Sequence, residues 1–165
     1  MVQAYVAIGS NLDPAARMQQ AARALRQRFP DARFSRCYRN PAFGFEGPDF
    51  YNAVAGFSTT LPVHALLPSL HEIEAQCGRA RADPKWGPRK MDLDLLLFGD
   101  AVGSAPGYTL PRRDLTRRVY MLGPLAELAP ECIYPPSGPT IGELWQQFPR
   151  AGLVLEPVEL DLKAA

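Results

Sequence analysis

The segment that most constrains the fold is the run Met-Asp-Leu-Asp-Leu-Leu-Leu-Phe at residues 91–98. Because successive side chains of a strand point to opposite faces, this run predicts a strand with both aspartates on one face. That face is expected to carry Asp92, Asp94, Leu96 and Phe98, and the other face Met91, Leu93, Leu95 and Leu97. The acidic end of the strand must then lie at the rim of a hydrophobic core, near water.

The other apolar segments alternate between the period of a strand and the period of a helix. The remaining strands are predicted at 4–8, 34–38 and 51–59, and short late helices around 122–128 and 141–148. Two longer helices are predicted before them. The first has Asp13 as its N-cap and Pro14 at its first position, and the second begins at Leu61-Pro62 and ends at Gly78. The segments 39–50 and 78–90 are expected to be loops.

The order of these elements is strand–helix–strand–strand–helix–strand. This is the order of a ferredoxin-like α+β sandwich, which predicts a mainly antiparallel sheet with the helices packed on one face. The 165 residues contain neither a repeat nor a domain linker. We therefore expect a single domain over residues 1–165.

Composition excludes several classes of protein. Hydrophobic residues make up 47% and charged residues 21%, so the chain is neither disordered nor fibrous. The apolar runs are too short to cross a bilayer, and the first residues lack the features of a signal peptide. Cys37, Cys77 and Cys132 are widely spaced and form no C-x-x-C pair. We expect a soluble cytoplasmic protein without a disulfide framework or a zinc site.

The net charge of +1 hides an uneven distribution. Residues 79–118 contain nine of the 18 Lys and Arg but five of the 17 Asp and Glu, so this segment carries +4 and the rest carries −3. A basic segment in an otherwise acidic chain favours a local anion site over a surface that coats nucleic acid. A solvated charged face is the alternative that charge alone leaves open.

Asp92 and Asp94 are the clearest candidate metal ligands. Two such carboxylates have stems roughly 6.5 Å apart, and at an effective dielectric of about 20 their repulsion is on the order of 2–3 kcal/mol. A divalent cation removes this repulsion, and Mg²⁺ prefers oxygen ligands. Each aspartate could instead pair with an arginine on an exposed strand end. The neighbouring arginines favour the metal, because a metal together with arginines is suited to polyphosphate.

Other common nucleotide and metal motifs are missing from the sequence. There is no G-x-x-x-x-G-K-[ST] motif and no G-x-G-x-x-G motif, so neither a P-loop nor a dinucleotide-binding turn is predicted. His71-Glu72 lacks the second histidine of H-E-x-x-H, so zinc hydrolysis is unsupported. The P-loop route to ATP is therefore closed.

A series of motifs resembles a known family. In chain order they are Gly9-Ser10-Asn11-Leu12, Tyr38-Arg39-Asn40-Pro41, Phe50-Tyr51-Asn52-Ala53, Ile73-Glu74, Gly78-Arg79-x-Arg81, Trp86-Gly87-Pro88-Arg89, Asp92-Leu93-Asp94 and Pro124-Leu125-Ala126-Glu127-Leu128. From about Ala4 to Trp145 the chain is similar to 6-hydroxymethyl-7,8-dihydropterin pyrophosphokinase of the folate pathway. The W-G-P-R-x-x-D-L-D block is highly specific.

The resemblance implies that the pterin hydroxymethyl oxygen attacks the β-phosphorus of ATP, giving the pterin diphosphate and AMP. It implies two Mg²⁺ ions held by Asp92 and Asp94, with Arg79 and Arg89 also catalytic. The implied nucleotide contacts are Glu74, Arg79, Arg81, Trp86, Arg89, Leu95, Thr109, Arg112, Arg113 and Arg118. The implied pterin contacts are Asn40, Pro41, Phe43, Gly44, Phe50, Asn52 and Tyr120.

The sequence departs from the family pattern mainly near the nucleotide. Gly107 stands where a basic residue is usual, and Arg112-Arg113 replaces a His-Tyr pair. Arginine offers phosphate a planar, permanently charged fork of donors, so Arg112 is expected to fill the role of the missing His. The alternative is that the Arg112 side chain points to solvent, where substitution would change little. Changes on the pterin side, such as Asn40 and Phe43, look conservative.

Two rival interpretations remain at this point. A ferredoxin-like sheet can bind RNA, although none of the predicted strands shows the aromatic pattern of RNA-binding modules. A catalytically inactive paralogue that still binds pterin or nucleotide is compatible with the changes at Gly107 and Arg112. We expect ATP and a reduced pterin as partners, neither nucleic acid nor membrane, and a monomer.

Overall fold

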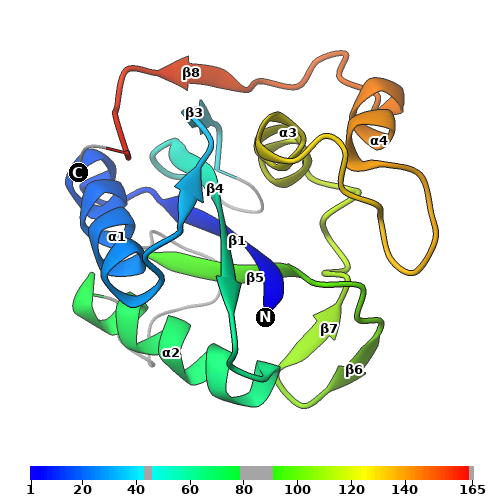
Figure 1. Cartoon of the computed structure of the whole chain (residues 1–165). Coiled ribbons are helices and arrows are strands. Elements are labelled where there is room, and N and C mark those ends of the chain that lie inside the picture. Colours follow the sequence, from blue (N-terminus) through cyan, green and yellow to red (C-terminus); the bar gives the residue numbers. More distant parts are fainter. Residues whose placement is uncertain (43–45, 79–90, 164–165) are drawn as a thin grey trace.

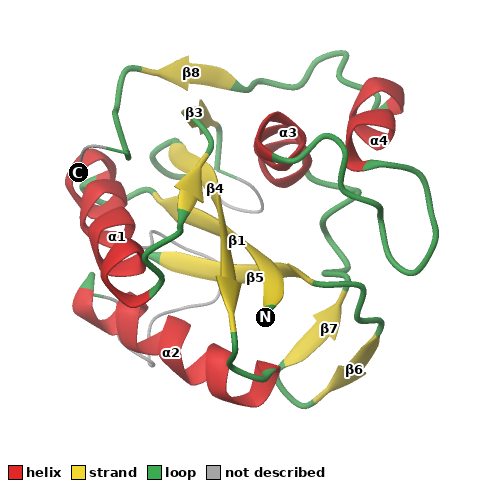
Figure 2. Ribbon diagram, in the orientation of Figure 1, coloured by secondary structure: helices red, strands yellow, loops and turns green. Residues whose placement is uncertain are grey.

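The protein is built around one large sheet and a separate two-stranded hairpin (Figure 2). The computed structural model describes residues 1–42, 46–78 and 91–163. Within them the large sheet has the strand order β5-β1-β4-β3-β8, with β2 also paired to β4, and each of these pairings is antiparallel. Its strands are β1 (Val2–Ser10), β2 (Arg33–Phe34), β3 (Cys37–Asn40), β4 (Phe50–Thr59), β5 (Asp92–Phe98) and β8 (Glu156–Val158).

Helices cover both faces of this sheet (Figure 1). α1 (Pro14–Arg28) and α2 (Val63–Gln76) lie on one face, α3 (Val119–Leu128) lies on the other, and α4 (Ile141–Gln147) packs against α3. The ferredoxin-like fold is confirmed, but the expectation that helices cover one face is wrong. Tyr5, Ala7 and Val54 make the second face of the sheet apolar, and α3 buries it.

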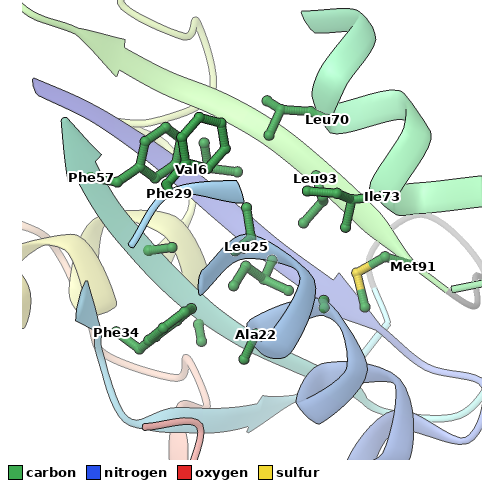
Figure 3. Packing of buried hydrophobic residues seen from close by; sticks show 14 of the residues in the cluster. Val6, Ala22, Leu25, Phe29, Phe34, Phe57, Leu70, Ile73, Met91 and Leu93 are labelled. Atoms are coloured by element: carbon green, nitrogen blue, oxygen red, sulfur yellow. The ribbon is translucent and has the colours of Figure 1, made fainter. Parts of the chain in front are cut away.

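The larger of two cores lies between the sheet and the pair α1–α2 (Figure 3). The predicted apolar positions of α1 are buried there, and so are those of α2 except Leu67, which is partly buried. Phe29, just after α1, stacks on Phe57 of β4 with ring centroids 3.9 Å apart. Leu93 and Leu95 reach this core from β5. The site-bearing strand is therefore anchored on its apolar face.

A β-bulge changes the second half of β5. Leu95 pairs with Val6 of β1 whereas Leu97 pairs with Tyr5, so Leu96 is an extra residue. An extra residue reverses the alternation beyond it. Leu97 therefore lies with Leu96 in the core under α3, and Phe98 packs against the larger core. The predicted faces of Leu97 and Phe98 are wrong, whereas the aspartates precede the bulge and lie on the face opposite the larger core.

Gly78 and Pro14 mark the end of α2 and the start of α1, as the sequence predicts, but the predicted N-cap of α1 does not form a capping hydrogen bond. Gly78, with φ of 90°, follows α2 and stops it. Pro14 opens α1, and Asp13 occupies the N-cap position. The Asp13 side chain makes no capping hydrogen bond, because its φ of 53° places it in the left-handed region rather than the extended region of a capping residue.

The predicted strand at 34–38 is split into β2 and β3 by Ser35. The Ser35 backbone N–H donates to the Val54 carbonyl over 2.9 Å, and the Ser35 hydroxyl accepts from the Val54 N–H over 2.9 Å. A side chain thus replaces one backbone acceptor of the ladder. Beyond the break, Arg39 and Asn40 continue as strand β3, whereas the sequence predicts a loop there.

Two short elements after β5 were not predicted. Strands β6 (Gly103–Ala105) and β7 (Tyr108–Leu110) form the hairpin, and Pro106-Gly107 is its two-residue turn. Gly107 has φ of 99°, a conformation that favours glycine and accounts for its presence at this position.

The C-terminal strand β8 forms the outer edge of the sheet beside β3. Glu156 accepts a hydrogen bond from Arg39 at 2.7 Å, and Pro157 is the middle residue of β8. The chain then returns to α1 (Figure 1), where Leu162 is buried in the larger core and its carbonyl accepts from Arg26.

Within the described residues, none of the helices has the length and apolarity needed to cross a membrane. All three cysteines are free thiols. Burial raises the pKa of the Cys37 thiol to about 12 and that of Cys77 to about 11, so both stay protonated at neutral pH.

The stacked pair of Phe29 and Phe57 predicts a large loss of stability on truncation. Phe57→Ala should lower the free energy of unfolding by about 3–5 kcal/mol, because it leaves a cavity in the larger core. Chemical denaturation measures this change. Val102→Ala is the control, since Val102 is 59% exposed and its truncation should have little effect. A loss at Phe57 similar to that at Val102 would contradict the packing.

Candidate active site

The candidate site lies on the α3 face of the sheet, beyond the part that α3 covers. In the register, Gly9 of β1 pairs with Asn52 of β4 on one side and with Asp92 of β5 on the other. Two residues earlier in β1, on the same face, Ala7 pairs with Val54 and with Asp94. Ala7 and Val54 belong to the core under α3. The row Asn52–Gly9–Asp92 therefore lies at the rim of that core.

Gly9 keeps the middle of this row open. A Cβ atom at this position would lie 2.9 Å from Asn52 Oδ1 and 3.9 Å from Phe50 Cδ1. The contact with the amide oxygen is closer than real side chains tolerate. The absence of a side chain at Gly9 thus lets Asn52 and Phe50 lie over β1 and gives a flat ligand room above the strand.

Two asparagines form the polar side of the site. Asn52 Nδ2 donates to Asn40 Oδ1, and Asn40 Nδ2 donates to the Pro41 carbonyl over 3.1 Å. Both residues are buried, at 6% and 5% exposure, where a polar group needs such partners. Because the Asn52 amide nitrogen is oriented toward Asn40, the Asn52 Oδ1 lies over Gly9 and is suited to accept a hydrogen bond from an N–H of a ligand.

The Gly9-Ser10-Asn11 turn fixes the segment next to the site. Asn11 is 2% exposed, and its Nδ2 donates to the Pro48 carbonyl over 3.1 Å. Pro48 precedes β4 and hence Phe50. Buried Asn11 therefore ties the end of β1 to the start of β4, which positions Phe50.

The aspartates occupy the other side of the row, with a cation beside them. Asp92 and Asp94 are half-buried, and Arg112 Nη1 lies 3.5 Å from Asp94 Oδ1. The Arg112 backbone N–H donates to the Leu96 carbonyl over 2.9 Å, which fixes this residue against β5. Arg112 Nε is buried and has no hydrogen-bond acceptor among the described residues.

Tyr120, in the first turn of α3, lies in the same charged neighbourhood. Burial raises its pKa, and the charges of Asp114 and Asp94 also raise it, whereas those of Arg118 and Arg112 lower it. Tyr120 thus stays a neutral phenol at physiological pH. It offers an aromatic ring beside the acidic side of the site, while Phe50 offers one over Gly9.

Glu74 of α2 holds the strand that carries the aspartates. It is 7% exposed near the end of α2, and its Oε2 accepts a hydrogen bond from the Leu93 backbone N–H over 2.7 Å. Leu93 lies between Asp92 and Asp94 on the edge strand β5. The buried carboxylate therefore fixes the backbone that carries both candidate metal ligands.

The other predicted nucleotide contacts come from several different segments. Arg118 is the residue just before α3, Thr109 is in β7, and Arg113 is exposed. The side chain of Leu95 is 5% exposed in the larger core, opposite the aspartates, so a nucleotide could meet this residue only through its backbone. Predictions that lie outside the described residues are those for Phe43, Gly44, Arg79, Arg81, Trp86 and Arg89.

The aspartate pair suits Mg²⁺ bound together with a polyphosphate. The described residues hold no group of three or more His, Cys, Asp or Glu side chains able to bind a metal by themselves. Two carboxylates on one face supply hard oxygen donors, and Mg²⁺ usually takes one or two carboxylates and completes its octahedron with water and substrate phosphates. The donor set therefore fits this ion.

Sequence reasoning missed Gly9, Asn11 and Asp114 as contributors to the site. Gly9 and Asn11 belong to the first family motif, but their roles depend on what the register brings beside them. Asp114 precedes α3 and lies close enough to Tyr120 for its charge to raise the pKa of that phenol. Nothing in the local sequence around Asp114 signals this.

Comparison with known proteins identifies the family. A profile described as 7,8-dihydro-6-hydroxymethylpterin-pyrophosphokinase (HPPK) matches residues 5–130. The chain belongs to this pyrophosphokinase family. The match contains the whole Asn52–Gly9–Asp92 row, together with Arg112 and Tyr120. Strand β8 and helix α4 lie beyond the matched range.

Individual relatives extend the pyrophosphokinase match. A 2-amino-4-hydroxy-6-hydroxymethyldihydropteridine pyrophosphokinase of Pseudomonas aeruginosa is 39% identical over 153 residues, which cover 90% of this chain and 93% of that protein. The enzyme of the same name from Synechocystis is 37% identical over 147 residues, 87% of this chain and 75% of that protein.

A solved structure shows the same fold at low sequence identity. The wild-type HPPK-DHPS of Plasmodium falciparum with pteroate superposes with a TM-score of 0.70 over 89% of this chain, at 13% identity. The match covers 42% of that longer chain. This likeness concerns the fold of the pyrophosphokinase part alone.

The close approach at Gly9 predicts a selective defect. In Gly9→Ala the added methyl displaces the Asn52 amide, so the affinity for a pterin analogue should fall at least about tenfold. Affinity for a magnesium–nucleotide complex should stay within about twofold, because none of the near contacts of that methyl involves Asp92 or Asp94. Calorimetric titration of the two ligands measures both. Equal loss of both affinities would refute this role, as would a change in neither.

The bond from Leu93 to Glu74 predicts a local effect on β5. Glu74→Ala leaves a buried N–H without its acceptor and should cost about 1–3 kcal/mol of stability. Amide hydrogen exchange of Leu93 should become faster in Glu74→Ala and stay slow in Glu74→Gln, which keeps an oxygen acceptor. Glu72→Ala on the same helix is the control, since Glu72 is exposed and forms a surface ion pair with Arg28. Unchanged hydrogen exchange at Leu93 in Glu74→Ala would show that the hydrogen bond to Glu74 does not hold β5 in place.

Proposed function

We propose that this protein transfers the pyrophosphoryl group of ATP to 6-hydroxymethyl-7,8-dihydropterin in folate biosynthesis, releasing AMP. The observation that carries the proposal is that Gly9 lies between two half-sites, a pterin half-site around Asn52 and a nucleotide half-site around Asp92. Asn52, suited to an amide-bearing ring, and Asp92, suited to a metal–polyphosphate, flank the same residue in adjacent strands. The family membership and the names of the relatives support the same reaction.

The pterin half-site orients the attacking group. The pterin ring lies over Gly9, where Asn52 Oδ1 accepts from its amide edge and Phe50 and Tyr120 supply aromatic faces. Offset stacking of this kind contributes about 0.5–1.5 kcal/mol beyond burial. The hydroxymethyl oxygen then forms a bond to the β-phosphorus of ATP, its proton is released, and the bond from the β-phosphorus to the α-phosphate oxygen breaks. Fixing the oxygen near phosphorus removes much of the entropic barrier.

The nucleotide half-site neutralises phosphate charge. Arg112 and Arg118 supply cations on the acidic side of the row, and charge-assisted hydrogen bonds to phosphate are among the stronger ones in proteins. We also assign phosphate or nucleotide contacts to Arg79, Arg81, Trp86 and Arg89, on the family resemblance alone. Thr109 and Arg113 are assigned the same role on the same resemblance.

Asp92 and Asp94 would hold Mg²⁺, and we propose two ions. When bound with ATP, the metal neutralises the negative charge that develops on the phosphates. Glu74 keeps the two carboxylates in place through Leu93. The chain's own contribution is to hold oxygen ligands at the rim of a water-excluding core.

We further propose that residues 1–165 act as one unit, as a monomer in the cytoplasm. The burial of Leu162 against α1 supports the first point, because the last described residues belong to the larger core. The three free thiols are compatible with a reducing compartment.

The reaction is tested with ATP, Mg²⁺ and the reduced hydroxymethylpterin. AMP and the pterin diphosphate should appear in equal amounts. Formation of ADP would contradict pyrophosphoryl transfer. Binding of both ligands without turnover would identify an inactive paralogue, and binding of RNA without either ligand would favour the nucleic-acid alternative.

The metal ligands are tested by isosteric variants. Asp92→Asn and Asp94→Asn should each reduce turnover by at least about a thousandfold, because the charge that holds the metal is lost. The unfolding free energy of Asp92→Asn should not fall, since two neighbouring carboxylates repel each other in the protein without metal. Asp94→Asn also loses its ion pair with Arg112 and should lose at most about 1 kcal/mol. Asp100→Asn, at an exposed position just after β5, is the control and should keep full activity. Near-normal AMP production by both site variants would exclude this metal assignment.

A further inference from the structure

Arg112 forms an ion pair with a residue that the proposed function assigns to the metal. Its Nη1 lies 3.5 Å from Asp94 Oδ1, and the two side chains are 36% and 23% exposed. A cation and Mg²⁺ compete for the same carboxylate, because each positive charge raises the energy of the other. Binding of Mg²⁺ at Asp94 must therefore change the surroundings of the Arg112 guanidinium.

The backbone of Arg112 is fixed while its side chain remains only partly satisfied. The Arg112 N–H bonds to the Leu96 carbonyl, and its own carbonyl accepts from the Leu115 N–H over 3.1 Å. The guanidinium has five N–H donors, yet its contact with Asp94 is long and its buried Nε lacks an acceptor among the described residues. The side chain thus has unused donors for an anion with several oxygens.

The charged groups on the acidic side of the site nearly cancel. Asp94, Asp114, Arg112 and Arg118 all act on the Tyr120 phenol, and Asp92 adds a third carboxylate, so these five groups carry a net charge of −1. A divalent cation added alone leaves an excess of positive charge next to Asp94. A cation that arrives with a polyphosphate brings its own negative charge and also gives Arg112 a new partner.

We propose that Arg112 is an internal counter-ion that occupies Asp94 until metal and polyphosphate bind together, and then transfers to the phosphate. This inference rests on the proposed function and deepens it. Free Mg²⁺ must displace the guanidinium without giving it another partner, whereas the metal–nucleotide complex supplies one. The site therefore selects the metal–nucleotide complex over the bare ion.

The proposal predicts that one substitution changes two affinities in opposite directions. Without nucleotide, Arg112→Met should bind Mn²⁺, a spectroscopic substitute for Mg²⁺, about fivefold more tightly than the wild type. This factor corresponds to about 1 kcal/mol, the upper range for a partly exposed ion pair. The same variant should bind magnesium with α,β-methylene-ATP at least about tenfold more weakly, because a charge-assisted contact to phosphate is lost.

Electron paramagnetic resonance titration of Mn²⁺ and calorimetric titration of the analogue measure the two effects. Arg117→Met is the matched control: Arg117 is exposed nearby and carries the same charge, so both of its affinities should match the wild type. Arg112→Lys keeps the charge without the planar fork, so its Mn²⁺ affinity should stay near the wild-type value. Arg112→Gln serves as a second neutral variant if the Met variant has a lowered melting temperature.

Three results would overturn the proposal. They are an unchanged Mn²⁺ affinity in both neutral variants, changes of the two affinities in the same direction, and an equal Mn²⁺ effect in Arg117→Met. The Mn²⁺ titration uses no nucleotide and no turnover. Its failure therefore leaves the test of AMP formation intact, and an inactive enzyme would still report on the counter-ion.

Discussion

Strand β1 pairs with β4 along its whole length and with β5 on its other side, and this double pairing places both halves of the site. A slip of one residue would send the side chains of a strand to the opposite face. Asn52 would then point into the larger core, and so would Asp92 if β5 slipped. The larger core prevents such slips, because Val6, Ile8 and Leu93 must all be buried on the same side. The hydrophobic effect in this core thus sets the geometry of a polar site on the other face.

The fold was predictable to the extent that each segment carries its own periodicity. The stripe of α1 and the alternation of β4 between Tyr51 and Thr59 depend only on local sequence, and both are confirmed. The bulge at Leu96 was not predictable, because three consecutive leucines are compatible with either face. The split at Ser35 likewise depends on a hydroxyl that reaches Val54, on a strand distant in sequence. Tertiary pairing decides such details, and local propensity does not.

The candidate site was predictable in chemistry but not in arrangement. The D-x-D pattern indicated two carboxylates on one face, and the structure places them there. The support of Leu93 by Glu74 could not be inferred, because a buried carboxylate near a helix end gives no sign of which N–H it binds. An ion pair between an aspartate and an arginine was one of the alternatives that the sequence left open, but nothing in the sequence indicated that Arg112 would be the partner of Asp94. For Trp86 and Arg89 the prediction remains one from resemblance.

The outer strands β5 and β8 of the large sheet each lack a free N–H donor at one position, which affects how the protein behaves at high concentration. Edge strands with unpaired N–H groups recruit strands from other molecules and so promote aggregation. On the β5 edge, the Leu93 N–H already donates to Glu74. On the opposite edge, Pro157 has no N–H to offer and interrupts the row of donors in β8. The carboxylate that fixes β5 and the proline of β8 therefore leave a second molecule fewer N–H donors with which to extend the sheet.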